Sequence, residues 1–330
     1  MEKMSRIDSL FDKKKVLFIT TKNLDYIRNE QEVQLVSEKA LSVKVIGSSK
    51  NNYFSRLVYV YIKILFQSMR DFDIVFVGFA PQLVVPFWKL KFRKRILVID
   101  FFVSMYDTFA CDRKKVKEKS FCAKALHWID KKTLDYADEI ITDTKTHGDF
   151  FCKEFGTSIN KIHILYLRAN KSVYYPRAQK KETGKENKFV VLYFGTILPL
   201  QGVDIIIKAI ELLKDKKNIF FYVIGPVDSR LKKTEQRNVE YINWLSQEEL
   251  ANYIAMADLC LAGHFSGEIE KAKRTIPGKA YIYEAMGKKM LLGDNMANRE
   301  LFEENDGKYF VQMGNPQALA DKIVKIMEER

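Results

Sequence analysis

The feature that most constrains the fold of this 330-residue chain is a repeated alternation of short apolar segments with longer helix-like segments. Helix-like stretches of the first half include Tyr53–Met69, Lys124–Tyr136 and Thr146–Phe155. Strands that are separated by helices pair in parallel, so the pattern predicts a doubly wound α/β sheet. The expected strands of this half are Lys15–Thr21, Ser42–Gly47, Asp73–Gly78, Arg95–Asp100, Glu139–Asp143 and Lys161–Leu165.

A polar and charged segment, residues 172–188, interrupts this pattern and is typical of a linker. We therefore predict an N-terminal domain over residues 1–180 and a C-terminal domain over residues 181–330. Both are expected to be Rossmann-like sheets that face a central cleft. In the second domain we expect strands at 189–194, 220–225, 239–243, 259–262 and 290–293, and helices at 203–213, 247–256, 279–286 and 316–328.

The composition is that of a globular protein, with 47% apolar and 29% charged residues. No apolar run reaches the ~18 residues that a membrane-spanning helix needs, and the first residues lack the apolar core of a signal peptide. The 4 cysteines have neither metal-site nor disulfide-framework spacing, and the 4 histidines suit no metal site. These observations favour a cytoplasmic protein with free thiols and no bound metal.

The charge of the chain is unevenly distributed. Residues 1–200 hold 36 Lys and Arg against 22 Asp and Glu, whereas residues 201–330 hold 19 against 20. The excess in the first part suggests an anionic partner, such as an acidic membrane surface, a polyphosphate or a nucleic acid. Solubility alone is the alternative explanation.

A basic stretch near the C-terminus, residues 271–279, holds the cations Lys271, Lys273, Arg274 and Lys279. Lys279 follows Pro277-Gly278, where a helix is expected to begin, and the free N–H groups of a helix start attract anions. Such a stretch can bind a doubly charged leaving group such as a nucleoside diphosphate. A solvated basic loop before a surface helix is the alternative.

Four features of the second half occur in a familiar order. They are the turn 195–202 after the first strand, the strand end Val223-Ile-Gly-Pro226, the segment 239–259, and the basic stretch followed by Arg299-Glu300. Together they resemble the GT-B glycosyltransferases of glycosyltransferase family four, the group 1 transferases. The resemblance spans roughly residues 15–325 and depends on the order of the motifs more than on any single one.

The resemblance implies a retaining, metal-independent transfer of a sugar from a nucleotide-sugar donor, without a cofactor. Cations and backbone N–H groups can stabilise the departing diphosphate without a metal. The implied donor-binding residues are Gly195, Thr196, Gln201, Gly202, Leu245, Lys273, Arg274, Lys279 and Glu284, with Lys271 in reserve. On the acceptor side the resemblance implies Ser104 and Tyr106, with Asp107 and Asp100 as catalytic candidates.

The chain departs from the family pattern at three places. Thr196 and Gln201 stand where many members carry Arg and Lys, so the basic stretch must supply the missing cations. Ile282 stands where an acidic residue is usual, and Glu284 lies two residues further on, about 200° around a helix. No glycine-rich loop follows Lys15–Thr21.

Two segments of the first half suggest a membrane surface. Over residues 53–70 the polar residues Arg56, Lys63, Gln67 and Arg70 are spaced to share one face of an apolar helix, and residues 87–95 alternate five cations with aromatic residues. An ordinary covering helix is the alternative for the first segment. Nucleic acid ranks well below a membrane, because no recognition motif accompanies the cations.

We therefore expect a glycosyltransferase that acts on a lipid-linked or polysaccharide acceptor at the inner face of a membrane, in cell-surface glycan biosynthesis. Two alternatives from other classes are a non-catalytic GT-B scaffold that binds a partner transferase and a nucleotide-sugar epimerase. Asp71-Phe-Asp73 matches a metal-binding pattern, but its position before a strand favours a solvated turn.

Overall fold

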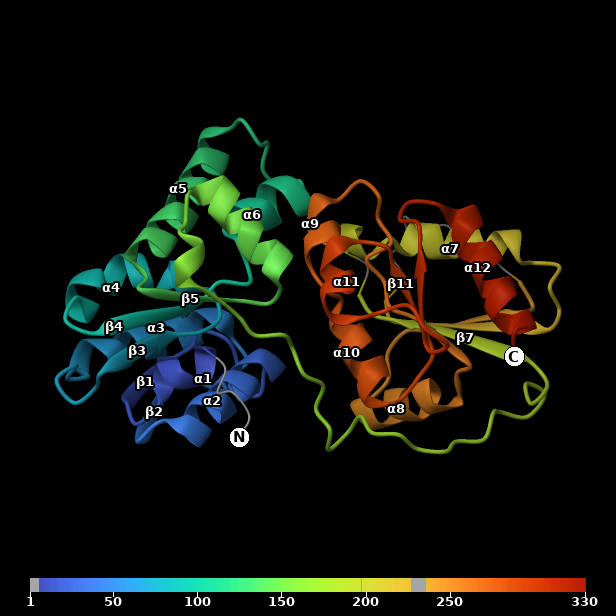
Figure 1. Cartoon of the computed structure of the whole chain (residues 1–330), viewed down its shortest axis with the longest axis horizontal. Coiled ribbons are helices and arrows are strands. Elements are labelled where there is room, and N and C mark those ends of the chain that lie inside the picture. Colours follow the sequence, from blue (N-terminus) through green and yellow to red (C-terminus); the bar gives the residue numbers. More distant parts are fainter. Residues whose placement is uncertain (1–5, 197, 227–235) are drawn as a thin grey trace. The chain divides into compact units, whose positions relative to one another are not determined.

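The computed structural model describes residues 6–196, 198–226 and 236–330. The chain divides into two compact units, Met1–Leu167 and Arg168–Arg330, which we call the N-terminal and C-terminal units. Each unit contains a six-stranded sheet of parallel strands with helices on both faces (Figure 1). The prediction of two doubly wound α/β sheets is therefore confirmed. The first residues, for which we expected no signal peptide, lie outside the described residues, as does Ile197 of the turn 195–202.

The sheet of the N-terminal unit has the strand order β2-β1-β3-β4-β5-β6. Its strands are β1 (Lys15–Ile19), β2 (Ser42–Ile46), β3 (Ile74–Val77), β4 (Ile96–Asp100), β5 (Glu139–Thr142) and β6 (Ile162–Ile164). Its helices are α1 (Arg6–Phe11), α2 (Ile27–Lys39), α3 (Tyr53–Phe66), α4 (Val85–Phe92), α5 (Phe121–Tyr136) and α6 (Lys145–Phe155). Shorter elements are η1 (Pro81–Leu83), the π-helical η2 (Asp107–Asp112) and η3 (Ile159–Lys161).

Alternate residues of each strand enter different apolar layers of this unit. Leu17 and Ile19 of β1 pack in the layer that contains Val60 of α3 and Phe151 of α6. Val16 and Phe18 belong, with α1 and α2, to the layer on the other face. Because successive side chains of a strand point to opposite faces, a strand that is covered on both faces is apolar throughout. This is the signal by which the sequence revealed these strands.

The sheet of the C-terminal unit has the order β12-β11-β10-β7-β8-β9. Its strands are β7 (Phe189–Phe194), β8 (Ile219–Ile224), β9 (Val239–Ile242), β10 (Leu259–Leu261), β11 (Met290–Gly293) and β12 (Lys308–Val311). Its helices are η4 (Pro199–Gln201), α7 (Val203–Leu212), α8 (Gln247–Met256), α9 (Glu270–Arg274), α10 (Gly278–Ala285), α11 (Met296–Leu301) and α12 (Pro316–Glu328).

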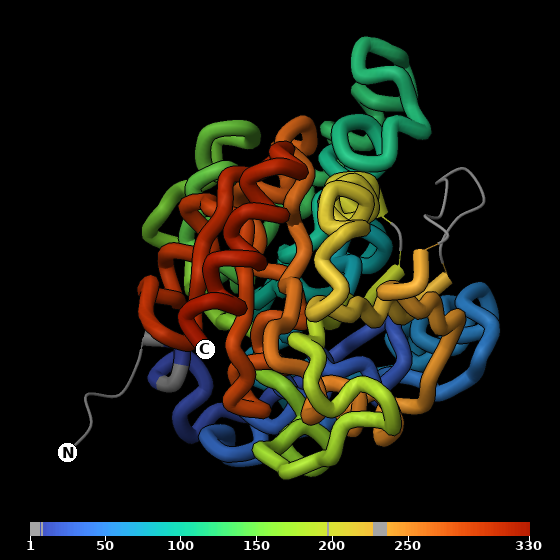
Figure 2. Tube along the Cα trace, turned by 90° about the vertical axis from the view of Figure 1, so that its right-hand side faces the viewer, coloured from blue at the N-terminus to red at the C-terminus, as the bar shows by residue number. Residues whose placement is uncertain are grey.

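Helices α7 and α12 lie next to each other on one face of this sheet (Figure 2). Ile206 and Ile210 of α7 pack with Leu319 and Ile323 of α12 against Val191 of β7. Side-chain caps define several helix starts: Ser246 and Glu249 form a capping box at α8, and Asn315 accepts a hydrogen bond from the N–H of Ala318 at α12. These caps fix the starts of α8 and α12, which follow the carboxyl ends of β9 and β12.

The expectation of a cationic stripe along residues 53–70 is wrong. Helix α3 ends at Phe66, so Gln67 and Arg70 lie beyond it. Arg56 is buried, and its guanidinium donates hydrogen bonds to the carbonyl oxygens of Thr21, Lys50 and Asn51. A buried guanidinium needs such acceptors, so Arg56 anchors α3 and cannot face a membrane.

Six α-helices and strands of the structure were not expected from the sequence: α1, α2, α4, α9, α11 and β12. Helix α9 overlaps the start of the basic stretch of residues 271–279, and α4 overlaps the basic and aromatic segment of residues 87–95. Among the described helices, none is both long and apolar enough to cross a membrane.

The core between α7 and the sheet yields a stability prediction. Ile206 is fully buried, so Ile206→Ala should lower the free energy of unfolding by about 2–5 kcal/mol, measured by denaturant unfolding. Leu212, on the same helix, is 51% exposed, and Leu212→Ala should cost far less. Equal losses in the two variants would contradict the packing described here.

Candidate functional site

The topology of the C-terminal sheet marks one place for a ligand. From β7 the chain proceeds outward to β8 and β9, and then returns to β10 on the other side of β7. In doubly wound sheets, ligands bind outside the carboxyl ends of the strands where the order reverses in this way. Gly195 directly follows β7 and Gly263 closely follows β10, so both lie at this switch point.

Lys279, in the first turn of α10, places its ammonium group at this point. Its Nζ donates a hydrogen bond of 2.5 Å to Oε1 of Gln201 and lies 4.9 Å from the centroid of the Tyr193 ring. The residue is only 7% exposed, and burial lowers its pKa to about 7. Among the described residues no carboxylate forms an ion pair with it, so the site favours an anion that would compensate the buried charge.

The glycines around Lys279 provide the space for its side chain. Gly195 and Gly263 have φ values of 140° and 84°, in the region that favours glycine. A Cβ on Gly263 would lie 2.9 Å from Nζ of Lys279, and a Cβ on Gly195 would lie 3.2 Å from its Cε. Gly202 is also constrained, because a Cβ there would lie 2.6 Å from the backbone nitrogen of Ser266. Larger residues at these positions would displace the lysine or the neighbouring loop.

Tyr193 is a site residue that the sequence reasoning missed. Its side chain is 1% exposed, and its hydroxyl has no hydrogen-bond partner among the described residues. Burial raises the pKa of this hydroxyl, which therefore stays protonated. Its position at the carboxyl end of β7, two residues before Gly195, is the signal that could have identified it. A buried hydroxyl without a partner, close to Lys279, can donate to a ligand.

Helix α9 is fixed against the site from the other side. Leu200 of η4 packs against Ile269 and Ala272 at α9. Nδ1 of the buried His264 lies 3.0 Å from the carbonyl oxygen of Thr275 and must donate to it, because a carbonyl only accepts. This contact connects the loop after β10 to the end of α9.

The cations of α9 differ in their surroundings. Arg274, the last residue of the helix, and Lys271 are half-buried. Lys273 is half-buried as well, and its Nζ forms an ion pair of 2.5 Å with Glu270. Arg274 is the cation of this helix that stands nearest in sequence to Lys279.

The structure brings most of the predicted donor residues to one edge of the sheet. Gly195, Thr196, Gln201, Gly202 and Lys279 surround the switch point, with Thr196 exposed to solvent. Leu245 follows β9 and lies at the same carboxyl edge.

Glu284 is not part of this group. Its carboxylate is exposed and forms an ion pair of 3.0 Å with Lys308, the first residue of β12. The pair therefore lies toward the amino ends of the strands, away from Lys279. Ile282, three residues after Lys279 on α10, is half-buried.

In the N-terminal unit, Asp100 ends β4 and is 1% exposed. Arg28 of α2 donates to both of its carboxylate oxygens, at 3.2 and 2.8 Å. Glu32 is also fully buried beside this pair, and burial and Asp100 raise the pKa of Glu32 well above its usual value. The charge of Asp100 is thus compensated inside its own unit, and its catalytic role stays a prediction.

Ser104, Tyr106 and Asp107 belong to a loop that a buried carboxylate organises. Asp130 of α5 accepts hydrogen bonds from Oγ of Ser104 at 2.7 Å and from the N–H of Tyr106 at 2.8 Å, and also from Gln82 and the N–H of Met105. Oγ of Ser104 in turn accepts from the N–H of Asp107 at 2.9 Å.

The exposure of these predicted residues differs. Ser104 and Asp107 are buried, and Tyr106 is half-buried. The roles of Ser104, Tyr106 and Asp107 stay predictions. Asp130, which the sequence reasoning missed, holds their loop in place.

The described residues offer no metal site: no group of three or more His, Cys, Asp or Glu side chains is placed to hold an ion. Asp73, of the pattern Asp71-Phe-Asp73, accepts a hydrogen bond from the backbone N–H of Lys15 at 2.8 Å. This carboxylate therefore fixes the turn before β3.

Residues 188–329 match the family model described as glycosyl transferases group 1. Spore coat protein SA of Bacillus subtilis (strain 168) is 21% identical over 280 residues, covering 76% of this chain and 68% of that protein. The chitobiosyldiphosphodolichol beta-mannosyltransferase of Candida albicans is 23% identical over 278 residues, and the match covers 73% of this chain and 60% of that protein.

Solved structures share the fold over nearly the whole chain. The sucrose-phosphate synthase of Thermosynechococcus elongatus matches with a TM-score of 0.66 and 11% identity, covering 96% of this chain and 90% of that chain. The Anabaena protein Alr3699/HepE in complex with UDP and glucose matches with a TM-score of 0.64 and 15% identity, with the same coverage of 96% and 90%. These likenesses confirm the predicted GT-B fold class.

The buried lysine makes stability depend on pH. Burial lowers the pKa of Lys279 from 10.5 to about 7, so between these values the unfolded chain binds one proton more than the folded chain. The contribution of Lys279 to the free energy of unfolding should rise with pH across this window, by up to about 1.4 kcal/mol per pH unit. The free energies of unfolding of wild type and Lys279→Met, measured from about pH 6 to about pH 9, give this contribution as their difference at each pH. The exposed Lys216→Met is the control, and a difference for Lys279 that does not change with pH would refute the assignment.

Proposed function

We propose that this chain, whose residues 188–329 match the family model described as glycosyl transferases group 1, is a glycosyltransferase that moves a sugar, with retention, from a nucleotide-sugar donor to a lipid-linked or polysaccharide acceptor. The activity would serve cell-surface glycan biosynthesis. The names of the relatives support sugar transfer: the Candida albicans protein is a mannosyltransferase, and the Anabaena structure contains UDP and glucose.

The observation that carries this proposal is the buried Lys279 ammonium at the switch point between β7 and β10. Transfer breaks the bond between the anomeric carbon and the diphosphate oxygen, and the electron pair leaves with the diphosphate. Negative charge therefore develops on the leaving group in the transition state. A cation that is already desolvated interacts strongly with that charge, because little water screens it.

Two further groups would share this task. Arg274 at the end of α9 supplies a second cation, and the first N–H groups of α10 have no side-chain cap. Helix starts with free N–H groups attract phosphates. In our proposal these protein groups stabilise the diphosphate without a metal ion. Asp107 and Asp100 are the proposed catalytic carboxylates, and Ser104 and Tyr106 belong to the proposed acceptor side.

Calorimetric titration with UDP, GDP, dTDP and ADP tests the donor site. Wild type should bind one of these nucleotides, and the double variant Lys279→Met/Arg274→Gln should bind it at least ~100-fold more weakly. Each lost charge-assisted hydrogen bond costs about 1.5–3 kcal/mol, and about 1.4 kcal/mol is tenfold in affinity. Lys273→Gln removes a nearby cation that is paired with Glu270, and should change affinity little.

The same titration separates the alternatives. If no nucleotide binds at millimolar concentration, the scaffold alternative is favoured and the proposal fails. If a nucleotide sugar is interconverted without any acceptor, the protein is an epimerase. Sugar transfer that needs an added acceptor supports the proposal.

We place the protein in the cytoplasm, at an anionic membrane surface, and propose that α3 and α4 form the contact. The two helices pack together: the Tyr61 ring of α3 lies 5.6 Å from the Trp88 ring of α4. The Tyr61 hydroxyl also donates to the carbonyl oxygen of Leu83, at the end of η1, at 2.5 Å. Their exposed apolar side chains are Phe54, Val58, Ile62, Leu65, Phe66, Phe87 and Leu90.

The charges beside this surface fit an anionic membrane. Lys63 and Lys89 lie on the two helices, and Lys91, Arg93 and Lys94 follow at the end of α4. Exposed apolar side chains can enter the boundary between headgroups and acyl chains, while neighbouring cations attract acidic lipids. A lipid-linked acceptor would be present in the same surface.

Vesicle sedimentation tests the membrane contact. Phe54 and Phe66 are 72% and 83% exposed, so Phe54→Ser/Phe66→Ser should leave the fold intact. The variant should partition at least ~10-fold less onto vesicles that contain an acidic phospholipid, because each phenylalanine contributes about 1.5–3 kcal/mol when buried. Phe121 of α5 is 86% exposed, and Phe121→Ser is the control. The proposal fails if wild type does not bind acidic vesicles, or if both variants bind equally.

A further inference from the structure

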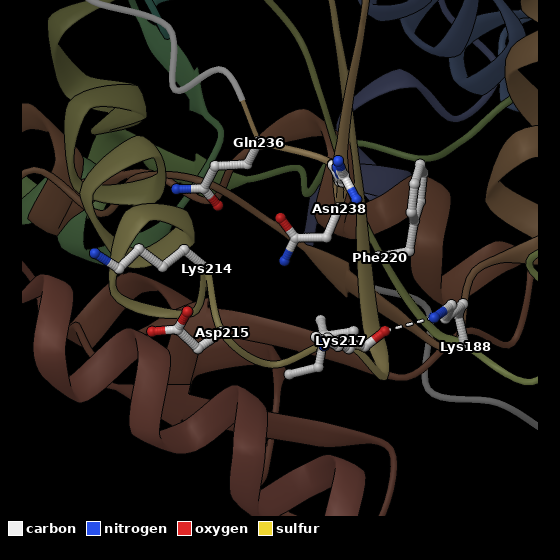
Figure 3. Close-up of a pocket in the computed structure, with 9 residues that line it drawn as sticks. Lys188, Lys214, Asp215, Lys217, Phe220, Gln236 and Asn238 are labelled. Carbon is white, nitrogen blue, oxygen red and sulfur yellow. Dashed lines mark hydrogen bonds between the residues drawn. The ribbon is translucent and has the colours of Figure 1, made fainter.

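A cavity lies in the C-terminal unit, at the amino ends of β7, β8 and β9 (Figure 3). Its volume is about 500 Å³, within the usual range for small-molecule sites. Lys188 precedes β7, Ile219 begins β8, and Asn238 precedes β9. Because the strands are parallel, this cavity and the Lys279 site lie at opposite ends of the same sheet.

The charge around the cavity is mostly positive. Among the described lining residues, the cations Lys188, Lys214, Lys217 and Arg237 stand against one carboxylate, that of Asp215. Nζ of Lys188 donates to the carbonyl oxygen of Lys217 at 2.6 Å, which fixes one edge of the cavity (Figure 3). A concave surface with this balance of charge attracts an anion.

Two amide oxygens in the wall call for hydrogen-bond donors. Asn238 is 9% exposed, and its Nδ2 donates to the carbonyl oxygen of Leu213 at 3.3 Å, which turns Oδ1 the other way. Oδ1 of Asn238 and Oε1 of Gln236 are buried and have no hydrogen-bond partner among the described residues. Figure 3 shows both side chains at the same hollow. Buried acceptors of this kind need donors, and the hydroxyls of a sugar supply more of them than a phosphate ion, which has few O–H groups at neutral pH.

The cavity therefore requires negative charge and hydrogen-bond donors in one ligand. A sugar that carries a phosphate or a carboxylate has both, because its hydroxyls can donate to the two amide oxygens. The half-buried Phe220 adds an apolar side chain to the lining, which suits the C–H face of a sugar ring. We propose that this cavity binds an anionic sugar, a phosphorylated or carboxylated monosaccharide unit.

This site goes beyond the proposed transferase activity and does not depend on it. The donor would bind at the carboxyl ends of the strands, whereas the anionic sugar would bind about 17 Å away, one strand length along β8. The ligand would be either a free sugar phosphate or one unit of an acidic glycan, since both have the same chemistry.

Calorimetry on full-length Lys279→Met tests the proposal, because that variant lacks the diphosphate contact of the donor site. Glucose 6-phosphate represents the free sugar phosphate, and an oligogalacturonate represents the acidic glycan. We expect one of them to bind, and the tighter one identifies the source. Adding Lys214→Gln/Arg237→Gln should weaken that binding at least ~10-fold, since each substitution removes a cation from the cavity. Both residues are exposed, so folding should be retained.

The matched control is Lys208→Gln/Lys216→Gln, which removes two exposed cations of the same unit outside the cavity. The affinity of this control for the anionic sugar should equal that of the Lys279→Met protein without the added substitutions. The proposal is overturned if neither anionic sugar binds at millimolar concentration, or if the cavity variant and the control bind equally. It is also overturned if inorganic phosphate binds as tightly as glucose 6-phosphate, because the amide oxygens would then have no role.

Discussion

The buried ammonium group of Lys279 is the interaction on which the candidate site depends. An uncompensated charge in the interior is costly. Within the part of the chain that the structure describes, the amide oxygen of Gln201 and the ring of Tyr193 lie against this ammonium group. The glycines that end β7 and follow β10 leave space for this side chain, and the turn of η4 brings Gln201 to it. These features have a common consequence: they keep a cation desolvated where a diphosphate would leave.

The two anion-binding sites that we infer in the C-terminal unit lie at the two ends of one parallel sheet. The carboxyl end provides a helix start without a side-chain cap, tight glycine turns and a deeply buried lysine. The amino end provides several exposed cations and two buried amide oxygens without partners. The first arrangement suits a leaving group whose charge changes during a reaction, whereas the second suits a ligand that is held without reacting.

The sequence predicted the sheets well because their strands are covered on both faces, which makes segments such as β7 apolar throughout. It missed α2 because Arg28, Asn29 and Glu32 occupy the buried face of that helix and remove its apolar periodicity. The pairing of Arg28 with Asp100 joins residues 72 positions apart, and no local pattern encodes such a partner. Tyr193, Asp130 and the burial of Arg56 were missed for the same reason, since their roles depend on contacts between distant segments.

A crystal structure of the protein with UDP, or with whichever nucleoside diphosphate binds most tightly, tests the central claim most directly. The account predicts that the diphosphate lies at the carboxyl ends of β7 and β10, with a phosphate oxygen within hydrogen-bond distance of Nζ of Lys279. A diphosphate bound elsewhere, for example in the cavity beside Lys214 and Arg237, with Lys279 still bonded only to Gln201, would contradict it.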